Sequence, residues 1–442
     1  MNLTSPAAQA ALRTAQTIKD ANHRVVFAGG CVRDFLLHAD PQDFDIATSA
    51  TPDEVEKLFK KTIPVGKQFG VILVIDQGEP IEVTTFRKEG GYQDGRHPTQ
   101  ISFTDDREDA LRRDFTVNGL FYDPFEKKII DYVDGQTDLK QRQIRAIGDP
   151  AKRFEEDKLR ILRAVRFASN LNFEIESETW RELKARAPQI TQVSPERIRD
   201  ELIKILTRSG AARGFDLLSE SGLMREILPE IEAMKGVQQQ PEYHPEGDVF
   251  VHTRLLLEKL EHPTITLAFG ALFHDVAKPV TAGRKDDGKI TFYEHAPIGA
   301  DMTRKIMKRL RFSNQEIEDT AVLVANHMKF GDAMRMRSGK LKMFIGHPQF
   351  TEGLELHRID CLSCHGMLGN YHFLKEKIKE LTAEELKPKP FITGADLLSL
   401  GMTAGPPMKP LLEEVYMLQL EGQFDSKEAA LIWVRHKITH PE

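Results

Sequence analysis

Residues 29–48, with the sequence GGCVRDFLLHADPQDFDIAT, decide the fold of the first part of the chain. The apolar run at 25–28 predicts a strand that enters the two glycines, and a short helix is expected directly after them. Residues i and i+2 of a strand point to the same face, so Asp43 and Asp45 on the next strand are expected to project together. Two neighbouring carboxylates repel each other unless a cation lies between them, and Mg²⁺ prefers carboxylate oxygens combined with substrate phosphates. The stretch therefore predicts a Mg²⁺ site on Asp43 and Asp45, beside a glycine turn and helix N-terminus that suit a phosphate.

Outward from this stretch, the spacing of apolar residues changes once. Apolar runs at 71–75 and 81–86 predict further strands, and Glu82 on the second of them is either a third carboxylate of the Mg²⁺ site or an ordinary strand-edge acid. From Arg153 to about residue 387 the apolar residues recur at helical spacing instead. The sequence thus predicts a multidomain fold that is α/β at first and all-α afterwards.

Turn-rich stretches divide this fold further. Residues 238–247 hold two prolines, a glycine and a run of glutamines and predict a linker, while prolines at 388 and 390 predict another joint. The predicted order is an α/β part at 1–150, a helical part at 151–240, a second helical part at 241–387, and a helical tail at 388–442.

The composition limits the class of protein. A chain of 442 residues is too long for one core, and 40% hydrophobic with 29% charged residues is typical of a soluble globular protein. The net charge of −6 gives no overall basic signature for nucleic acid, so RNA binding requires a local patch. No apolar run reaches membrane-span length, and the N-terminus lacks an apolar signal core. Three cysteines give no disulfide framework, so we expect a cytoplasmic protein without a membrane partner.

Five motifs, in order, resemble those of class II tRNA nucleotidyltransferases and bacterial poly(A) polymerases, members of the polymerase β superfamily. They are GGCVRD with DFDIAT at 29–48, RRDFTVNGL at 112–120, EDKLR at 156–160, RAVRF at 163–167 and PERI at 195–198. The resemblance covers about residues 20–235 and implies a polymerase β-like nucleotidyltransferase head. It implies that 1–150 is this head and that 151–240 is a neck and body for nucleotide templating and RNA binding. It implies catalytic acids at Asp43 and Asp45, to which Glu82 is the candidate third acid by its strand position. The nucleotide-binding residues are expected at Gly29, Gly30, Arg33, Arg112, Arg113, Asp114, Asn118, Asp157, Arg160, Arg163 and Arg166.

The third of these motifs predicts how a base is selected. Asp157 and Arg160 lie three apart on a predicted helix, hence on one face. An Asp accepts a hydrogen bond from an exocyclic amine, and an Arg donates to a ring acceptor; CTP and ATP present both groups, whereas UTP and GTP present the reverse. The pair can therefore act as a protein template, although a surface ion pair between the two is the other reading of this spacing.

The resemblance also indicates which reaction to expect. Residues 65–74 are similar to the form that adds CCA, and the Gly-rich segment at 87–108, with YQDGR at 92–96, predicts a full-length loop of the kind that the family uses to move from C to A. We expect untemplated addition of CMP, CMP and AMP, from CTP and ATP, to the 3′ end of tRNA. Addition of A alone and poly(A) synthesis are the alternatives within the family, and a non-catalytic tRNA-binding protein is the alternative outside it.

A second group of possible ligands lies in the helical region. It consists of His252, His274, Asp275, His295, His327 and Asp360. Imidazole and carboxylate together suit a divalent transition metal such as Mn, Fe, Co, Ni or Zn. His274-Asp275 with the Lys-Pro pair at 278–279 resembles the HD superfamily of phosphohydrolases, which implies attack by metal-bound hydroxide on a phosphate ester. The hydrolytic activity of this domain is then either additional to nucleotide addition or, if the head is catalytically inert, the main activity of the chain.

Two other features of the helical region carry weaker predictions. Residues 301–345 hold ten Lys or Arg against five Asp or Glu, so this segment is either a solvated face or a surface for tRNA phosphates. Cys361, Cys364 and His365 do not supply the four ligands that structural zinc requires, and we predict small buried side chains there. The sequence does not predict the oligomeric state.

Overall fold

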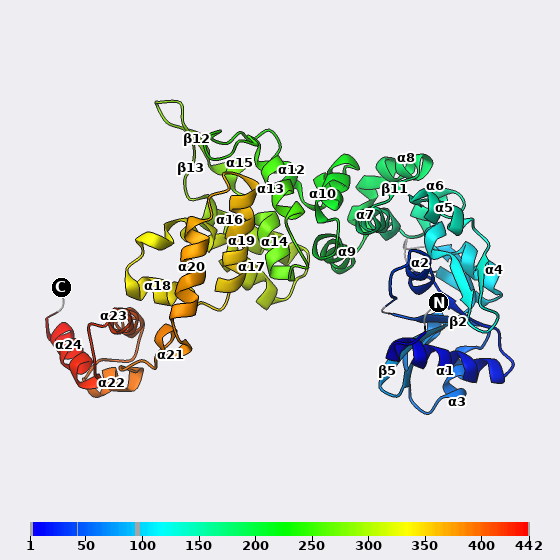
Figure 1. Cartoon of the computed structure of the whole chain (residues 1–442), viewed down its shortest axis with the longest axis horizontal. Helices are drawn as coiled ribbons and strands as arrows, with labels where there is room; N and C mark the ends of the chain where they lie inside the picture. The colour runs from blue at the N-terminus through cyan, green and yellow to red at the C-terminus, as the bar shows by residue number, and fades with distance from the viewer. Residues whose placement is uncertain (1–2, 42, 93–97, 441–442) are drawn as a thin grey trace. The chain divides into compact units, whose positions relative to one another are not determined.

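The structure is a computed structural model that describes residues 3–41, 43–92 and 98–440. It divides into two compact units that meet between Pro229 and Glu230. Figure 1 shows the first unit in blue to green and the second in green to red. The first unit carries the sheet and the second is helical, which confirms the predicted fold class. The finer division into four parts stays a prediction.

A seven-stranded sheet forms the framework of the first unit, in the order β3-β4-β5-β2-β1-β8-β9. The strands are β1 (Val25–Ala28), β2 (Asp45–Thr48), β3 (Thr62–Gly66), β4 (Val71–Asp76), β5 (Glu79–Thr85), β8 (Leu120–Asp123) and β9 (Lys128–Asp131). β2 and β5 pair in parallel, and the other neighbours pair antiparallel. All four residues of β1 are buried in the centre of the sheet, which explains why this strand reads as a continuous apolar run.

The Gly-rich segment at 87–108 was predicted to be one loop, and the structure differs from this prediction. Its arms pair antiparallel as β6 (Arg87–Tyr92) and β7 (Pro98–Phe103), because backbone groups along both arms find partners in each other. The centre of the predicted loop, 93–96, lies outside the described residues.

Short helices cover the sheet. They are α1 (Pro6–Asp20), α2 (Gly30–Leu36), α3 (Pro52–Leu58), α4 (Asp106–Leu111) and α5 (Gly135–Gln141). In α1 the buried residues include Ala8, Ala11, Ala15 and Ile18, an apolar stripe at helical spacing that packs on β5. Ser5 caps this helix by accepting a hydrogen bond from the Ala8 N–H at 3.2 Å.

The helical part of the first unit follows the sheet. It contains α6 (Pro150–Glu156), α7 (Leu159–Leu171), α8 (Ser177–Arg186), α9 (Pro195–Thr207), α10 (Ala211–Glu220) and α11 (Leu223–Ile227), with a short parallel pair, β10 (Gln143–Ile144) and β11 (Glu174–Ile175). The short α12 (Pro229–Glu232) lies across the boundary to the second unit. Ten of the 13 residues of α7 are buried, since α9 and α10 both pack against it. This places the charged residues of α7 against the interior of the unit.

The second unit is built from helices and one hairpin. Its helices are α13 (Val249–Glu258), α14 (Ile265–Phe273), α15 (Lys278–Thr281), α16 (His295–Arg309), α17 (Asn314–Asn326), α18 (Ser338–Ile345), α19 (Phe350–Ser363), α20 (Gly369–Glu380), α21 (Ala383–Leu386), α22 (Gly394–Ser399), α23 (Met408–Leu420) and α24 (Lys427–Thr439). A hairpin of β12 (Ala282–Arg284) and β13 (Ile290–Phe292) interrupts the predicted helical run, so the prediction of helix was wrong there. Within the described chain, no helix is both long and apolar enough to cross a membrane.

Candidate active site and metal centre

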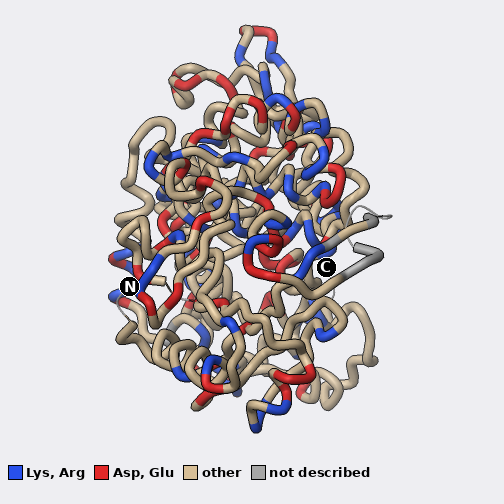
Figure 2. Tube along the Cα trace, turned by 90° about the vertical axis from the view of Figure 1, so that its right-hand side faces the viewer, with Lys and Arg blue, Asp and Glu red and all other residues tan. Residues whose placement is uncertain are grey.

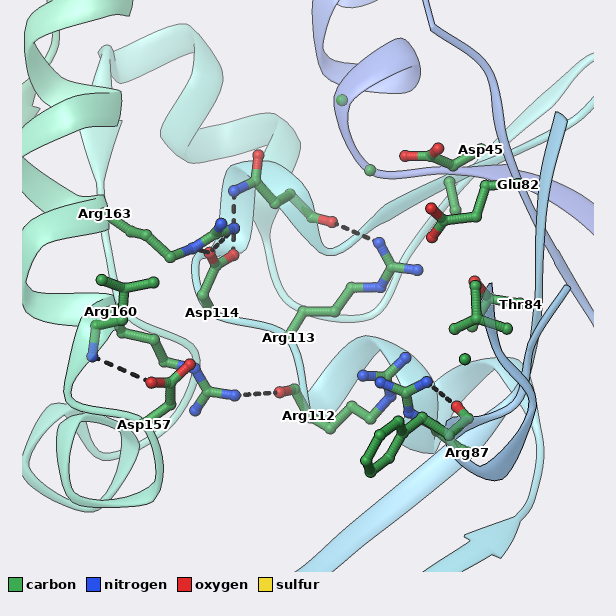
Figure 3. A pocket seen from close by; sticks show the side chains of 18 of the residues that line it. Asp45, Glu82, Thr84, Arg87, Arg112, Arg113, Asp114, Asp157, Arg160 and Arg163 are labelled. Carbon is green, nitrogen blue, oxygen red and sulfur yellow. Dashed lines mark hydrogen bonds and ion pairs between the residues drawn. The ribbon is translucent and has the colours of Figure 1, made fainter. Parts of the chain in front are cut away.

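A cavity of about 840 Å³ opens in the first unit between the sheet and the first turns of α7. Its size lies within the range of small-molecule sites. All of the predicted site residues of this unit except Asp43 line it: Gly29, Gly30, Arg33, Asp45, Glu82, Arg112, Arg113, Asp114, Asn118, Asp157, Arg160, Arg163 and Arg166. Figure 3 shows the carboxylates of Asp45 and Glu82 at one end, Asp157 and Arg160 at the other, and arginines between them.

The carboxylate end is set by the parallel pairing of β2 with β5. Ile46 is the register partner of Val83, so the residues that precede them, Asp45 and Glu82, lie side by side on neighbouring strands. Burial, then the charge of Glu82 and, more weakly, that of Asp43 raise the pKa of Asp45 to about 6, although the charge of Arg113 opposes this. Asp43 lies two residues before β2 begins, so the prediction of both aspartates on one strand was wrong. The three carboxylates nevertheless interact, and their repulsion favours a bound cation.

The glycine turn between β1 and α2 requires glycine for two reasons. Gly29 has φ of +69°, a conformation that L side chains rarely adopt. A Cβ added there would also lie 3.1 Å from the Nη1 atom of Arg113. Any larger residue at 29 would therefore strain the turn and displace an arginine of the cavity.

Asp109, which the sequence motifs do not single out, holds two of the arginines. Its side chain is fully buried at the end of α4 and lies 2.7 Å from Nη2 of Arg112 and 3.1 Å from Nη2 of Arg113. Burial opposes its ionisation, but the two guanidinium groups outweigh burial and lower the pKa of Asp109. The spacing of Asp109 to the two arginines, i+3 and i+4, was the signal that could have found it.

Asp114 connects the middle of the cavity to α7 and α2. It accepts hydrogen bonds from Asn118 Nδ2 at 3.0 Å and from Arg163 Nε at 2.8 Å, and Asn118 Oδ1 accepts one from Arg33 at 2.8 Å. Burial opposes the charge of Asp114, yet Arg163 and Asn118 hold its pKa well below the usual range. The network fixes Arg33 and Arg163 in orientation before any ligand binds.

The far end of the cavity holds Asp157 and Arg160, whose local structure differs from the prediction. α6 ends at Glu156 and α7 begins at Leu159, so Asp157 lies in an extended joint and the prediction of one continuous helix was wrong. Asp157 accepts hydrogen bonds from Arg197 Nη2 at 2.8 and 3.2 Å. Arg160 donates to Glu156 Oε2 at 2.7 Å. Both side chains are thus anchored by other residues, and neither forms the surface ion pair with the other that was the alternative reading.

Arg166 lies deeper than the other arginines of the cavity. It pairs with Glu201 of α9 at 2.7 Å, and both side chains are buried. Burial lowers the pKa of Arg166 to about 10, although the Glu201 charge opposes this. This ion pair links α7 to α9 at the buried side of the cavity.

The six predicted metal ligands of the second unit come from five places in the chain. These are α13, the turn after α14, the start of α16, the 3₁₀ helix after α17, and α19. Asp275 Oδ1 lies 3.6 Å from His295 Nε2 and 3.9 Å from His327 Nε2, and Asp275 Oδ2 lies 3.1 Å from His274 Nε2. His252 Nε2 lies 3.0 Å from Asp360 Oδ1. Donor atoms around one cation, at bond lengths of about 2.1 Å, lie about 3–3.5 Å apart. The separations of 3.0 and 3.1 Å fall in this range, and those of His295 and His327 from Asp275 exceed it by 0.1 and 0.4 Å, so a small movement of these side chains would let them share a cation.

Three of the imidazoles are held with the same nitrogen toward the cluster. The Nδ1 atoms of His274, His295 and His327 lie 2.6–2.9 Å from the backbone oxygens of Ala271, Phe292 and Val324. A backbone oxygen only accepts, so each Nδ1 carries the proton and each Nε2 presents a lone pair. The Nε2 atoms of His295 and His327, which carry two of these lone pairs, lie 3.2 Å apart. Burial is the main cause that lowers the pKa of His327 to about 3, which keeps the ring neutral.

The predicted linker at 238–247 contributes two further residues that sequence reasoning missed. His244 and Glu246 form a possible metal-holding group with His252. Gln239 is buried beside Lys278, whose ammonium also contacts Asp275 at 2.7 Å. Among the described residues, the groups able to hold a metal contain no cysteine, and Cys361 is buried.

Comparison with known families agrees with this arrangement of sites. Three family models match: Poly A polymerase head domain over residues 25–145, Probable RNA and SrmB-binding site of polymerase A over 172–235, and HD domain over 247–364. The head model covers the sheet and the carboxylate end of the cavity. The HD model covers all six predicted metal ligands of the second unit.

Individual relatives are similar over nearly the whole chain or over about half of it. The CCA-adding enzyme of Lactobacillus johnsonii is 33% identical over 425 residues, which cover 96% of this chain and 95% of the relative. The CCA-adding enzyme of Levilactobacillus brevis is 46% identical over 209 residues, which cover 47% and 52%. The solved structure of the Bacillus stearothermophilus CCA-adding enzyme in complex with CTP is similar with a TM-score of 0.75 at 25% identity, over 99% of this chain and 98% of that one.

Proposed function

This chain belongs to the family of CCA-adding enzymes, and we propose on that premise that it adds CMP, CMP and AMP to the 3′ end of tRNA. The observation that carries the proposal is the single cavity with metal-type carboxylates at one end and an Asp and Arg suited to a base at the other. A nucleoside triphosphate has the same order of groups: phosphates, sugar and base. CTP and ATP are the proposed substrates.

The reaction forms a bond between the tRNA 3′ oxygen and the α-phosphorus, and breaks the bond from that phosphorus to the β-phosphate bridge. Pyrophosphate leaves, and the 3′ hydroxyl loses its proton. Asp43, Asp45 and Glu82 fit Mg²⁺, which prefers carboxylate oxygens, and burial together with the charges of Glu82 and Asp43 raises the pKa of Asp45. Mg²⁺ would supply activation of the hydroxyl and charge stabilisation on the phosphates. Arg112 and Arg113, aimed by Asp109, would bind the triphosphate and sugar.

Assays with defined tRNA ends test this proposal. We expect tRNA lacking CCA to gain two C residues with CTP alone, and the complete CCA with CTP plus ATP. A tRNA lacking only the last A should accept ATP, and a complete tRNA should accept nothing, because the family reaction stops there. Incorporation only on the tRNA that lacks A would instead identify A-only addition, and long A tails would identify poly(A) synthesis.

We propose a second activity, metal-dependent hydrolysis of a phosphate ester, in the HD domain. It is supported by buried ligand atoms that face the cluster: within the described part of the chain, His274 Nε2, His252 Nε2 and Asp275 Oδ2 are buried without a well-aligned hydrogen bond. The six ligands would hold Mn, Fe, Co, Ni or Zn, which supplies a bound hydroxide as nucleophile. The chain's own Lys278 would balance the charge of Asp275.

Metal removal tests this second activity. We expect the chain, stripped with a chelator, to lose hydrolysis of p-nitrophenyl phosphate or its diester and to regain it with one of these metals. His327→Ala should abolish this rescue and lower metal binding, because it removes a buried ligand. His372→Ala, on the exposed face of α20, is the matched control and should behave as wild type. Equal hydrolysis by His327→Ala and wild type would show that the cluster is not the hydrolytic site.

The surface that would bind tRNA is proposed to lie on the helical part of the first unit. Figure 2 shows basic and acidic residues interspersed along the trace. In the basic segment 301–345, Arg304 contacts Asp301 and Glu318, and Arg309 contacts Glu230. These pairs weaken the case for this segment as a phosphate surface, whereas the family model over 172–235 favours the helical part of the first unit. We further propose a cytoplasmic location, which the free cysteines support.

A further inference from the structure

Glu246 joins the metal cluster of the second unit to a loop that contains none of its expected ligands. Its Oε1 atom lies 2.7 Å from His252 Nδ1 and 2.9 Å from His244 Nδ1. The Glu246 side chain is 6% exposed and that of His252 is fully buried. A carboxylate oxygen cannot donate, so the tautomer that suits this contact carries its proton on His252 Nδ1 and leaves Nε2 available to a metal.

The opposite nitrogen of the same ring faces the cluster. His252 Nε2 lies 3.0 Å from Asp360 Oδ1, and the His252 ring lies edge-on to that of His274 with centroids 5.3 Å apart. His274, His295 and His327 are oriented by neutral backbone oxygens, whereas His252 alone among these four is oriented by a carboxylate. A carboxylate behind a ligating imidazole fixes its tautomer and raises its basicity.

The loop that carries Glu246 is itself held in place. The Gly247 N–H donates to the His244 oxygen at 2.9 Å, and the Gln239 N–H donates to the Gly247 oxygen at 2.8 Å. Asp248 caps α13, the helix of His252, by accepting from the N–H groups of Phe250 and Val251. Glu246 therefore contacts His252 from a hydrogen-bonded turn, not from an unstructured linker.

We propose that Glu246 is a positioning residue of the metal site: it orients His252 so that Nε2 binds the metal, with His244 as a second imidazole on the same carboxylate oxygen. The inference rests on the proposed metal-dependent function of the HD domain. It assigns a role to a residue outside the six predicted ligands, and it predicts that the part of the site formed by His252 depends on Glu246. The part formed by Asp275, His295 and His327 does not contact Glu246 in any described interaction.

Metal affinity tests the proposal directly. Calorimetric titration of the chelator-stripped full chain with Co²⁺ should show Glu246→Ala binding about 10- to 100-fold more weakly than wild type, the usual effect of losing an outer-shell partner. Glu246→Gln keeps an acceptor oxygen without the charge, so it should lie between the two. Glu242→Ala, an exposed glutamate of the same loop, is the matched control and should bind as wild type.

A spectroscopic readout separates positioning from a general structural role. In Zn²⁺-loaded chain with ¹⁵N-labelled histidine, wild type should show a slowly exchanging Nδ1 proton on His252, assigned by its loss in His252→Ala. Glu246→Ala should lose this signal while those of His295 and His327 persist. Unchanged affinity in Glu246→Ala, or loss of all the histidine signals together, would overturn the inference. Absence of Co²⁺ binding by wild type would instead overturn the metal site itself.

Discussion

Asp45→Ala is expected to abolish nucleotide addition with CTP and ATP alike, while leaving metal binding by the second unit intact. Asp45 lies beside Glu82 through the parallel pairing of β2 with β5, and the Asp43 charge reaches it from just before the strand. Removal of one carboxylate leaves too few oxygens for Mg²⁺. Since metal-ion catalysis contributes several kcal/mol, kcat should fall by about 10³-fold or more.

The measurement is single-turnover incorporation on a tRNA that lacks CCA, with saturating CTP and with a range of Mg²⁺ concentrations. Asp53→Ala is the matched control, because Asp53 is an exposed aspartate of the same unit that contacts Lys67 on the surface. Asp45→Asn keeps the shape of the side chain and should fail as Asp45→Ala does. Wild-type rates in Asp45→Ala would show that the metal carboxylates lie elsewhere.

The sequence predicts best those elements whose buried apolar residues alone determine where they begin and end. β1 begins and ends where its four apolar residues predict, since a central strand is buried on both faces. The hairpin of β12 and β13 was missed, although Asp287-Gly288 between its arms is a hairpin signal, because each arm has only three residues and none of them is buried.

The site residues follow a similar division. The site residues that belong to the ordered motifs lie along one cavity, but some of the residues that orient them are distant in the sequence. Arg197 reaches Asp157 across 40 residues, and the joint between α6 and α7 follows no proline or glycine. Glu246 lies in a stretch whose prolines and glycine predict only a linker. Long-range contacts of this kind require the folded chain.

Asp157→Ala is expected to lose selectivity between bases while it keeps phosphoryl transfer. A carboxylate has about four lone-pair positions, and three are used by Arg197 Nη2, which contacts both oxygens, and by the Leu159 N–H at 3.1 Å. One acceptor position remains for the amine of cytosine or adenine. Arg160 uses three of its five N–H groups on Glu156 and on the backbone oxygens of Arg153 and Arg112. Two donors remain for a ring acceptor.

UTP and GTP would set a carbonyl oxygen against this carboxylate, and an unpaired polar group in a closed pocket costs about 1–3 kcal/mol. The CTP-to-UTP ratio of kcat/KM should therefore fall by about 10- to 100-fold in Asp157→Ala, whereas Asp45→Ala loses the chemistry for every nucleotide. Asp157→Asn sharpens the test, because its amide N–H can donate to the uracil oxygen and should raise UTP use above that of Asp157→Ala. Glu155→Ala, an exposed acid of α6, is the control. An unchanged CTP-to-UTP ratio in Asp157→Ala would mean that this aspartate only joins two helices, and that another residue selects the base.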